Sequence, residues 1–136
     1  MDDLDSASGI ARSALKAQAT RLRAISENVA NADSVSETAG GAPYRRKTVN
    51  FRNVLDKELG ADIVKVDKIR NDQSKLPTKY DPNHPGANAQ GYVLMPNVNP
   101  LIEMMDMREA NRSYEAALNV IQAVDSMEEK LKGLLK

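Results

Sequence analysis

Apolar and small residues recur along the last third of the chain at alternating intervals of three and four residues. The mean interval of about 3.5 residues is the period of helices that pair as coiled coils. No Pro or Gly interrupts residues 101–132, so the pattern predicts one long helix. Its seam consists of Met107, Ala110, Tyr114, Ala117, Ile121, Val124, Leu131 and Leu135, and only Glu128 breaks it.

Residues 4–32 show the same alternation and predict a second long helix. A neighbouring line of small and apolar residues widens the apolar arc of this helix beyond what one partner helix covers. We therefore expect several partners, of which the C-terminal helix is one; a monomeric helical hairpin over a small core is the simpler alternative. The N-terminal seam consists of Leu4, Ser8, Ala11, Leu15, Gln18, Leu22, Ile25, Val29 and Ala32.

The middle of the chain, residues 43–98, predicts a small, extended, partly β insertion. Alternating and β-branched residues favour strands at 45–51, 61–69 and 92–95, whereas residues 71–79 are polar and irregular. Four prolines between positions 77 and 96 disfavour a helix there. The expected fold is mainly α: long N- and C-terminal helices pair as a coiled coil around an extended or β insertion. The corresponding segments are 1–34, 35–99 and 100–136.

Composition narrows the classes of function. The 19 basic and 19 acidic residues balance, so no global field favours nucleic acid or an anionic membrane. The absence of Cys removes disulfides, thiolate catalysis and cysteine-ligated zinc. The first residues are acidic and lack the apolar core of a signal peptide, and no apolar run approaches the roughly 20 residues of a membrane span. We expect a soluble chain that, if exported, leaves the cytoplasm without signal cleavage.

Candidate chemistry is sparse. The single histidine, His84, lies between Pro82 and Pro85 and is interpreted as a turn residue rather than a metal ligand or catalytic base. The basic cluster at 45–47 with Arg52 lacks the interleaved aromatic residues that stack on bases, which favours a solvated or protein-facing strand.

The acidic residues Glu103, Asp106 and Glu109 are interpreted as groups that meet the positive end of the C-terminal helix dipole. Glycine-rich phosphate loops, nucleophile elbows and metal-spaced His pairs are absent from the sequence. The pattern therefore indicates neither an enzyme nor a cofactor or small-molecule substrate.

The end of the first helix, Asn28-Val29-Ala30-Asn31-Ala32-Asp33-Ser34, resembles the signature of bacterial flagellar rod and hook proteins. Further blocks over nearly the whole chain are similar to proximal-rod members of this family. The chain departs only mildly from the usual residues of this family, at Glu27, at Val29 and over a divergent stretch at 53–75. The further blocks are Pro43-Tyr44-Arg45, Tyr80-Asp81-Pro82-Asn83-His84-Pro85, Gly91-Tyr92-Val93, Met95-Pro96-Asn97-Val98, Glu103-Met104-Met105 and Ala110-Asn111-Arg112-Ser113-Tyr114-Glu115-Ala116.

The resemblance implies a non-enzymatic subunit that is exported through the flagellar type III apparatus. Copies of such a protein, with other rod proteins, polymerise into a helical tube. The tube is the rod, a drive shaft that crosses the periplasm and transmits torque from rotor to hook. The resemblance marks as family-motif residues Asn28, Asn31, Pro43, Tyr44, Gly91, Tyr92, Pro96, Asn97, Arg112 and Tyr114.

The two seams then predict the assembly interface. Burying one Leu or Ile contributes roughly 1.5–3 kcal/mol, so several per subunit would stiffen the wall of a tube. We expect both ends of an isolated subunit to be partly unfolded, because the apolar arcs lack their partners. The predicted interface consists of Leu15, Leu22, Ile25 and Val29 in the N-terminal helix and Met107, Ile121, Val124 and Leu131 in the C-terminal helix.

Two alternatives of a different class stay open at this point. A soluble helical adaptor that binds a single partner protein predicts a defined complex of low order. A nucleic-acid-binding module that uses residues 45–52 predicts steeply salt-dependent association.

Overall fold

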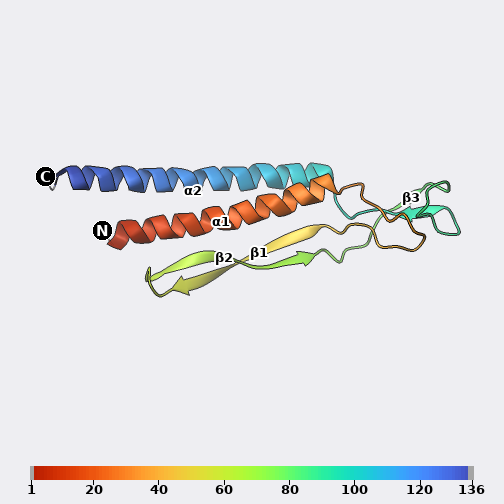
Figure 1. Cartoon of the computed structure of the whole chain (residues 1–136), viewed down its shortest axis with the longest axis horizontal. Coiled ribbons are helices and arrows are strands. Elements are labelled where there is room, and N and C mark those ends of the chain that lie inside the picture. Colours follow the sequence, from red (N-terminus) through yellow and green to blue (C-terminus); the bar gives the residue numbers. More distant parts are fainter. Residues whose placement is uncertain (1, 135–136) are drawn as a thin grey trace. The chain divides into compact units, whose positions relative to one another are not determined.

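The computed structural model describes residues 2–134, which form two long helices and, between them, four strands (Figure 1). Helix α1 spans Asp2–Ala30 and helix α2 spans Pro100–Leu134. Strands β1 (Lys47–Asp56) and β2 (Ala61–Asn71) form one two-stranded sheet, and β3 (Thr78–Tyr80) and β4 (Tyr92–Leu94) form another. The predicted class, mainly α with a small β insertion between terminal helices, is confirmed. Leu135, the last residue of the predicted seam, lies outside the described residues.

The strands differ from the prediction in their limits. β1 and β2 continue to Asp56 and Asn71, beyond the predicted ends at 51 and 69, because each supplies the other with a hydrogen-bonding partner. The polar residues 78–79, predicted to be irregular, belong to β3, which is antiparallel to β4 with Lys79 opposite Val93. These polar residues have only a weak local preference for a strand, but pairing with β4 is sufficient to form one.

The chain divides into two compact units, each built from several segments. The first unit contains residues 1–22, 49–68 and 108–136. The second unit contains residues 23–48 and 69–107.

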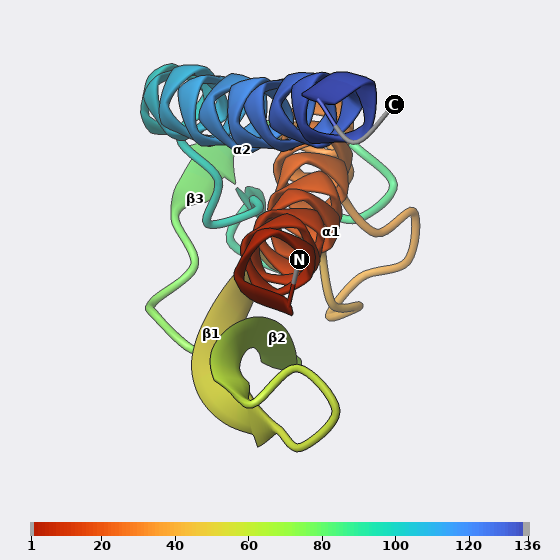
Figure 2. The same cartoon turned by 90° about the vertical axis from the view of Figure 1, so that its left-hand side faces the viewer.

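In the first unit, α1 lies between the hairpin of β1 and β2 on one side and α2 on the other (Figures 1 and 2). The Ser6 hydroxyl donates a hydrogen bond to the carbonyl of Leu59 in the hairpin (3.0 Å), and Arg21 pairs with Glu109 of α2 (3.6 Å). A Cβ at Gly9 would lie 2.5 Å from a methyl carbon of Leu59, so glycine permits this close approach. The wide apolar arc of α1 thus has two partners within the chain. The buried apolar side chains of this unit are mostly small: Ala11, Ala17, Ile63, Ala110, Ala117 and Val124.

The second unit contains the last two turns of α1, the first two turns of α2 and the β3–β4 sheet. Gly91 precedes β4 with a φ of +83°, and a Cβ there would lie 2.9 Å from the ring of Tyr80, so the position requires glycine. Among the described residues the largest fully buried side chains are not apolar but are those of Glu103 and Asn28. Since buried polar groups must be hydrogen-bonded, these two side chains are expected to lie within a network of polar contacts.

Candidate functional site

Asn28, in the last turn of α1, is the centre of a buried polar junction in the second unit. Its amide nitrogen donates to the carbonyl of Lys47 (2.9 Å) and to Oε2 of Glu103 (3.0 Å). Its amide oxygen accepts from the backbone N–H of Lys47 (2.8 Å) and from the hydroxyl of Tyr44 (2.8 Å). Asparagine has two donors and two acceptor sites, and all are used here. An aspartate would lose both donors and face the carboxylate of Glu103, so the junction requires the amide.

Glu103, in the first turn of α2, has a side chain with no exposed surface. Its Oε1 accepts from Nε of Arg46 in a close ion pair, and the same guanidinium contacts Asp106 (3.2 Å) and Asp72 (3.9 Å). The hydrogen bond to Glu103 raises the pKa of Arg46, against the opposing effect of burial. An unpaired carboxylate in this place would cost several kcal/mol, so the two side chains must be buried together.

Glu103 lies in the first turn of α2, as the helix-dipole interpretation requires, but the acidic residues of this region also have ion-pair partners that the interpretation did not include. Glu103 and Asp106 are partners of Arg46, and Glu109 is a partner of Arg21. Glu103 is one residue in a buried stripe of α2 with a seven-residue interval, which continues with Ala110, Ala117 and Val124. The position of Glu103 in line with these small and apolar residues is therefore the feature of the sequence that could have indicated the buried junction.

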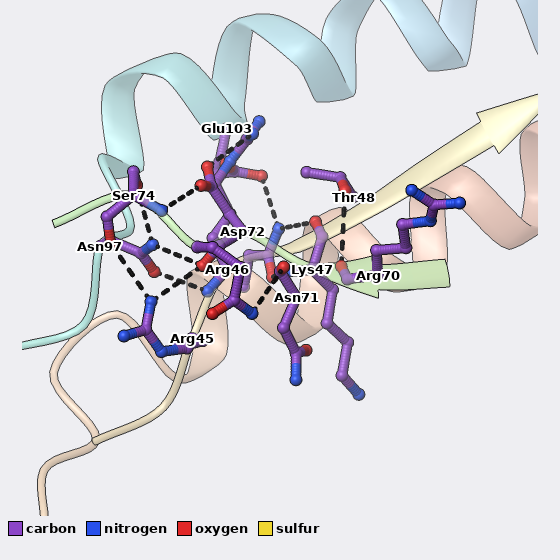
Figure 3. A network of polar contacts seen from close by, with 12 residues as sticks. Arg45, Arg46, Lys47, Thr48, Arg70, Asn71, Asp72, Ser74, Asn97 and Glu103 are labelled. Carbon is purple, nitrogen blue, oxygen red and sulfur yellow. Dashed lines mark hydrogen bonds and ion pairs between the residues drawn. The ribbon is translucent and has the colours of Figure 1, made fainter. Parts of the chain in front are cut away.

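Asn97 connects the junction to the loop between β2 and β3 (Figure 3). Its Oδ1 accepts from the backbone N–H of Arg46 (2.8 Å), while Nδ2 donates to the carbonyl of Asp72 and the hydroxyl of Ser74 (both 3.0 Å). The side chain of Arg45 donates to the same carbonyl of Asp72 (3.0 Å). The hydrogen bonds from Ser74 lower the pKa of Asp72. The junction thus joins four segments that are distant in the sequence: the end of α1, residues 44–47, residues 72–74 and residues 97–106.

The basic residues near the start of β1 form ion pairs with acidic residues of the same chain. Lys47 pairs with Glu27 (2.6 Å), Arg52 pairs with Asp67 (3.5 Å), and Arg46 faces inward. Arg46 lies just before β1 and faces the protein's own carboxylates, and its side chain is only 25% exposed. These pairings occupy the cations that the nucleic-acid alternative requires.

The family-motif residues occupy several separate places. Asn28, Tyr44 and Asn97 meet in the junction, and Pro43 and Pro96 are buried in the same unit. The side-chain amide of Asn31 donates to the carbonyl of Glu27 (2.8 Å) and caps the end of α1.

The remaining motif residues lie outside the junction. Gly91 and Tyr92 belong to the turn and strand of the β3–β4 sheet, where the ring of Tyr92 meets that of Tyr80 edge-on with centroids 5.2 Å apart. Arg112, which is exposed, and Tyr114, which is half-buried, lie on α2 in the first unit. His84 lies in a turn, as predicted, and its Nδ1 accepts from the backbone N–H of Gly86 (2.9 Å).

The residues of the predicted assembly interface differ in exposure. Ile25 and Val124 are each 5% exposed, so their side chains already pack within the chain. Leu131 is 41% exposed. The other five are half-buried and lie at the edges of the packed seams: Leu15, Leu22, Val29, Met107 and Ile121.

The sequence analysis missed a second, exposed apolar stripe on α2. It lies beside the buried stripe and contains Ala116, Val120, Ala123 and Met127 at intervals of four, three and four residues. Val120 is 46% exposed and Met127 is 53% exposed. Together with α1, part of this stripe forms an apolar groove of about 520 Å³ lined by Ala7, Ile10, Ala11, Ala14, Ser113, Ala116, Ala117 and Val120.

Neither helix, over residues 2–134, contains an apolar stretch long enough to cross a membrane. Comparison with known sequences places two parts of the chain in flagellar families. Residues 10–36 match the family described as "Flagella basal body rod protein", and residues 89–134 match "Flagellar basal body rod FlgEFG protein C-terminal".

Individual relatives are similar over most of their length. The chain is 52% identical over 136 residues to the flagellar basal-body rod protein FlgC of Agrobacterium fabrum. The aligned region covers 100% of this chain and 98% of that protein. It is 39% identical to FlgC of Bacillus subtilis over 133 residues, with 87% and 89% of the two chains covered. It is 42% identical to FlgC of Salmonella typhimurium over 118 residues, with 87% of each chain covered.

Proposed function

The chain belongs to the FlgC family of flagellar basal-body rod proteins, and we propose that it is a non-enzymatic structural subunit of the proximal part of that rod. The observation that carries this proposal is the 52% identity to the Agrobacterium fabrum protein over 136 residues, since it extends across both terminal helices and the insertion. The function requires no cofactor, no small-molecule substrate and no nucleic acid.

The subunit polymerises through its terminal helices. The helices α1 and α2 pair as a coiled coil, which the seven-residue interval of the buried stripe supports. The apolar groove between them, with its floor of alanines, has the shape and chemistry to accept a helix of a neighbouring subunit at close range. The half-buried seam residues, such as Leu22 and Ile121, form the edges of this lateral contact.

The three segments of the chain have different roles in the assembly. Residues 1–34 and 100–136 provide the assembly helices, and residues 35–99 provide the outer contacts. The polar junction around Asn28 and Glu103 ties the insertion to both helices, so that torque applied to one segment reaches the others. The partners are other copies of this chain and other rod proteins in a helical tube.

The location follows from the same role. The flagellar type III apparatus exports the chain without signal cleavage, and the assembled subunit resides in the rod within the periplasmic space. There the packed helices resist twisting and transmit torque from the rotor towards the hook.

The test is incorporation into purified hook–basal bodies from cells whose own copy is replaced by a variant. We expect mass spectrometry to find the wild-type chain in these particles and to find Val120→Asp at least about tenfold depleted, with loss of motility, because a charge in the apolar groove opposes helix packing. The control Asn119→Asp adds the same charge at the next exposed position and should assemble normally.

Absence of the wild-type chain from the particles would overturn the structural role. A small complex with one partner protein in the cytoplasm would then favour the helical adaptor. Normal assembly and motility of Val120→Asp would instead remove the groove from the interface and leave the role itself intact.

A further inference from the structure

A second groove in the first unit lies between α1 and β2 and differs in chemistry from the alanine-lined one. It measures about 480 Å³, and Ala17 and Ile63 in its lining are 3% and 6% exposed. Its rim carries the exposed cations Arg12, Lys16 and Lys65. None of these three side chains forms an ion pair with any residue from 2 to 134. The groove therefore presents an apolar floor beneath three available positive charges.

The two helices segregate charge in opposite senses. Residues 6–26 of α1 contain four basic residues (Arg12, Lys16, Arg21 and Arg23) and no acidic residue. Residues 113–129 of α2 contain four acidic residues (Glu115, Asp125, Glu128 and Glu129) and no basic residue. Among residues 2–134 the ion pair between the two helices joins Arg21 to Glu109, which precedes the acidic stretch, so the charges of the two stretches do not pair with each other.

One face of α2 has a charge complementary to that of the basic groove. Glu115, Leu118, Asp125 and Glu129 follow one another at intervals of three, seven and four residues, which places them on one side of the helix. All four are exposed, and Leu118 is 40% exposed in the middle of this acidic face. Leu118 has a carboxylate one turn before it and two more about two and three turns after it, and a face of this kind is complementary to an apolar floor with cations on its rim.

We propose that the groove between α1 and β2 binds the acidic face of α2 from a second copy of this chain. Leu118 of the second copy enters the groove over Ala17 and Ile63, and its flanking carboxylates pair with Arg12, Lys16 and Lys65. This inference rests on the proposed polymeric function and adds to it a named contact.

The contact joins two different surfaces, so it is heterologous. Each copy that receives α2 in its groove still offers its own α2 to the next copy. Such a contact does not close with two copies and propagates into a ring or a helix of subunits. A chain with these two surfaces thus has a direction of growth built into one interface.

Cysteine crosslinking tests the contact, because the natural chain contains no Cys. Full-length Lys16→Cys and Glu115→Cys variants are co-expressed in cells that lack the natural copy, and isolated hook–basal bodies are treated with a short bis-maleimide linker. We expect a crosslinked dimer when the two single variants are co-expressed. A chain that carries both Lys16→Cys and Glu115→Cys should give a ladder of higher oligomers. Lys16→Cys paired with Glu37→Cys, a loop position of the same original charge, is the matched control and should give no dimer.

Three results would overturn the proposal. The first is assembled particles without a Lys16→Cys to Glu115→Cys dimer, and the second is a dimer equally strong with Glu37→Cys. The third is a crosslink from Lys16→Cys to a different rod protein, which would make that protein the occupant. Particles that lack the chain altogether would overturn the proposed function as well, so the two failures can be told apart.

Charge reversal provides an independent readout. We expect Arg12→Glu with Lys16→Glu to lower the crosslinked fraction of a pair of groove and helix cysteines, Thr20→Cys with Gln122→Cys, by about tenfold, because like charges then face each other. Adding Glu115→Lys and Asp125→Lys should restore it. A failure of the compensating changes, with circular dichroism unchanged from wild type, would refute the electrostatic part of the match.

Discussion

The buried carboxylate of Glu103 accepts a hydrogen bond on each oxygen, and this makes Glu103→Gln a sharp perturbation. Arg46 donates to Oε1 and Asn28 donates to Oε2. Glutamine has the same size but offers one acceptor and one donor. The amide of Asn28 cannot rotate to compensate, because its oxygen already accepts from Lys47 and Tyr44. In either orientation, therefore, glutamine loses one bond and turns a donor toward a donor.

The expected cost follows from these two losses. A hydrogen bond to a charged group contributes about 1.5–3 kcal/mol, and a buried donor without an acceptor costs about 1–3 kcal/mol. Arg46 keeps its contact to Asp106 and is 25% exposed, which favours the lower part of both ranges. We predict that Glu103→Gln lowers the free energy of unfolding by about 3 kcal/mol. The control Asp106→Asn changes a side chain that is 32% exposed and should cost only about 0.5 kcal/mol.

Urea unfolding of the purified full-length variants, followed by circular dichroism at neutral pH, gives both values. Equal slopes against urea concentration would show that the midpoint shift reflects stability rather than a change in the unfolded state. A difference below about 1 kcal/mol between Glu103→Gln and Asp106→Asn would refute the reasoning, since the buried and the partly exposed carboxylate would then be equivalent.

Further predictions concern two glycines and one carboxylate. Gly91→Ala should lower the free energy of unfolding by about 1–2 kcal/mol in the same assay, because φ is +83° and the new Cβ would meet the Tyr80 ring. Gly133→Ala, in α2 with no atom within 4 Å of the new Cβ, should instead raise stability by about 0.5 kcal/mol, and a loss there would contradict the helical assignment. Asp72 has a lowered pKa in the folded chain, so its contribution is present above the unfolded pKa of about 3.9 and is lost as the pH falls through the folded pKa. Asp72→Asn should therefore be less stable than wild type at pH 6 and should match it below the folded pKa in urea titrations across pH; a deficit that persists in strong acid would show that charge is not the cause.

The long helices could be predicted from the sequence because their periodicity is a local property. A seven-residue apolar repeat places side chains on one helix face whatever the rest of the chain does, and α1 and α2 lie within a few residues of the predicted limits. The predicted assembly interface, by contrast, stays a prediction. Burial of Ile25 and Val124 shows only that a seam serves the fold of one chain, and the same pattern does not reveal which side of the helix another subunit would use.

The polar junction could not be predicted, because its partners are far apart in the sequence. Arg46 and Glu103 are separated by 57 residues, and Asn28 and Glu103 by 75 residues. A glutamate in the first turn of a helix has an adequate local explanation in the helix dipole, so nothing in its immediate neighbours points to an arginine. Strand β3 was missed for a similar reason, since three polar residues become a strand only when β4 lies beside them.

The start of α2 has an unusual distribution of charged and apolar side chains. Glu103 is fully buried, whereas its neighbours Leu101, Ile102, Met104 and Met105 are 68%, 50%, 55% and 63% exposed. An ordinary amphipathic helix has the opposite distribution. Because saturated hydrogen bonds and an ion pair hold this turn in place, the chain can fold here without consuming its apolar side chains. Those side chains then remain available for contacts between subunits. Substitutions in the junction should consequently reduce the stability of the isolated chain, whereas polar substitutions at Leu101 or Met105 should leave that stability within about 0.5 kcal/mol of wild type and act only on incorporation into the rod.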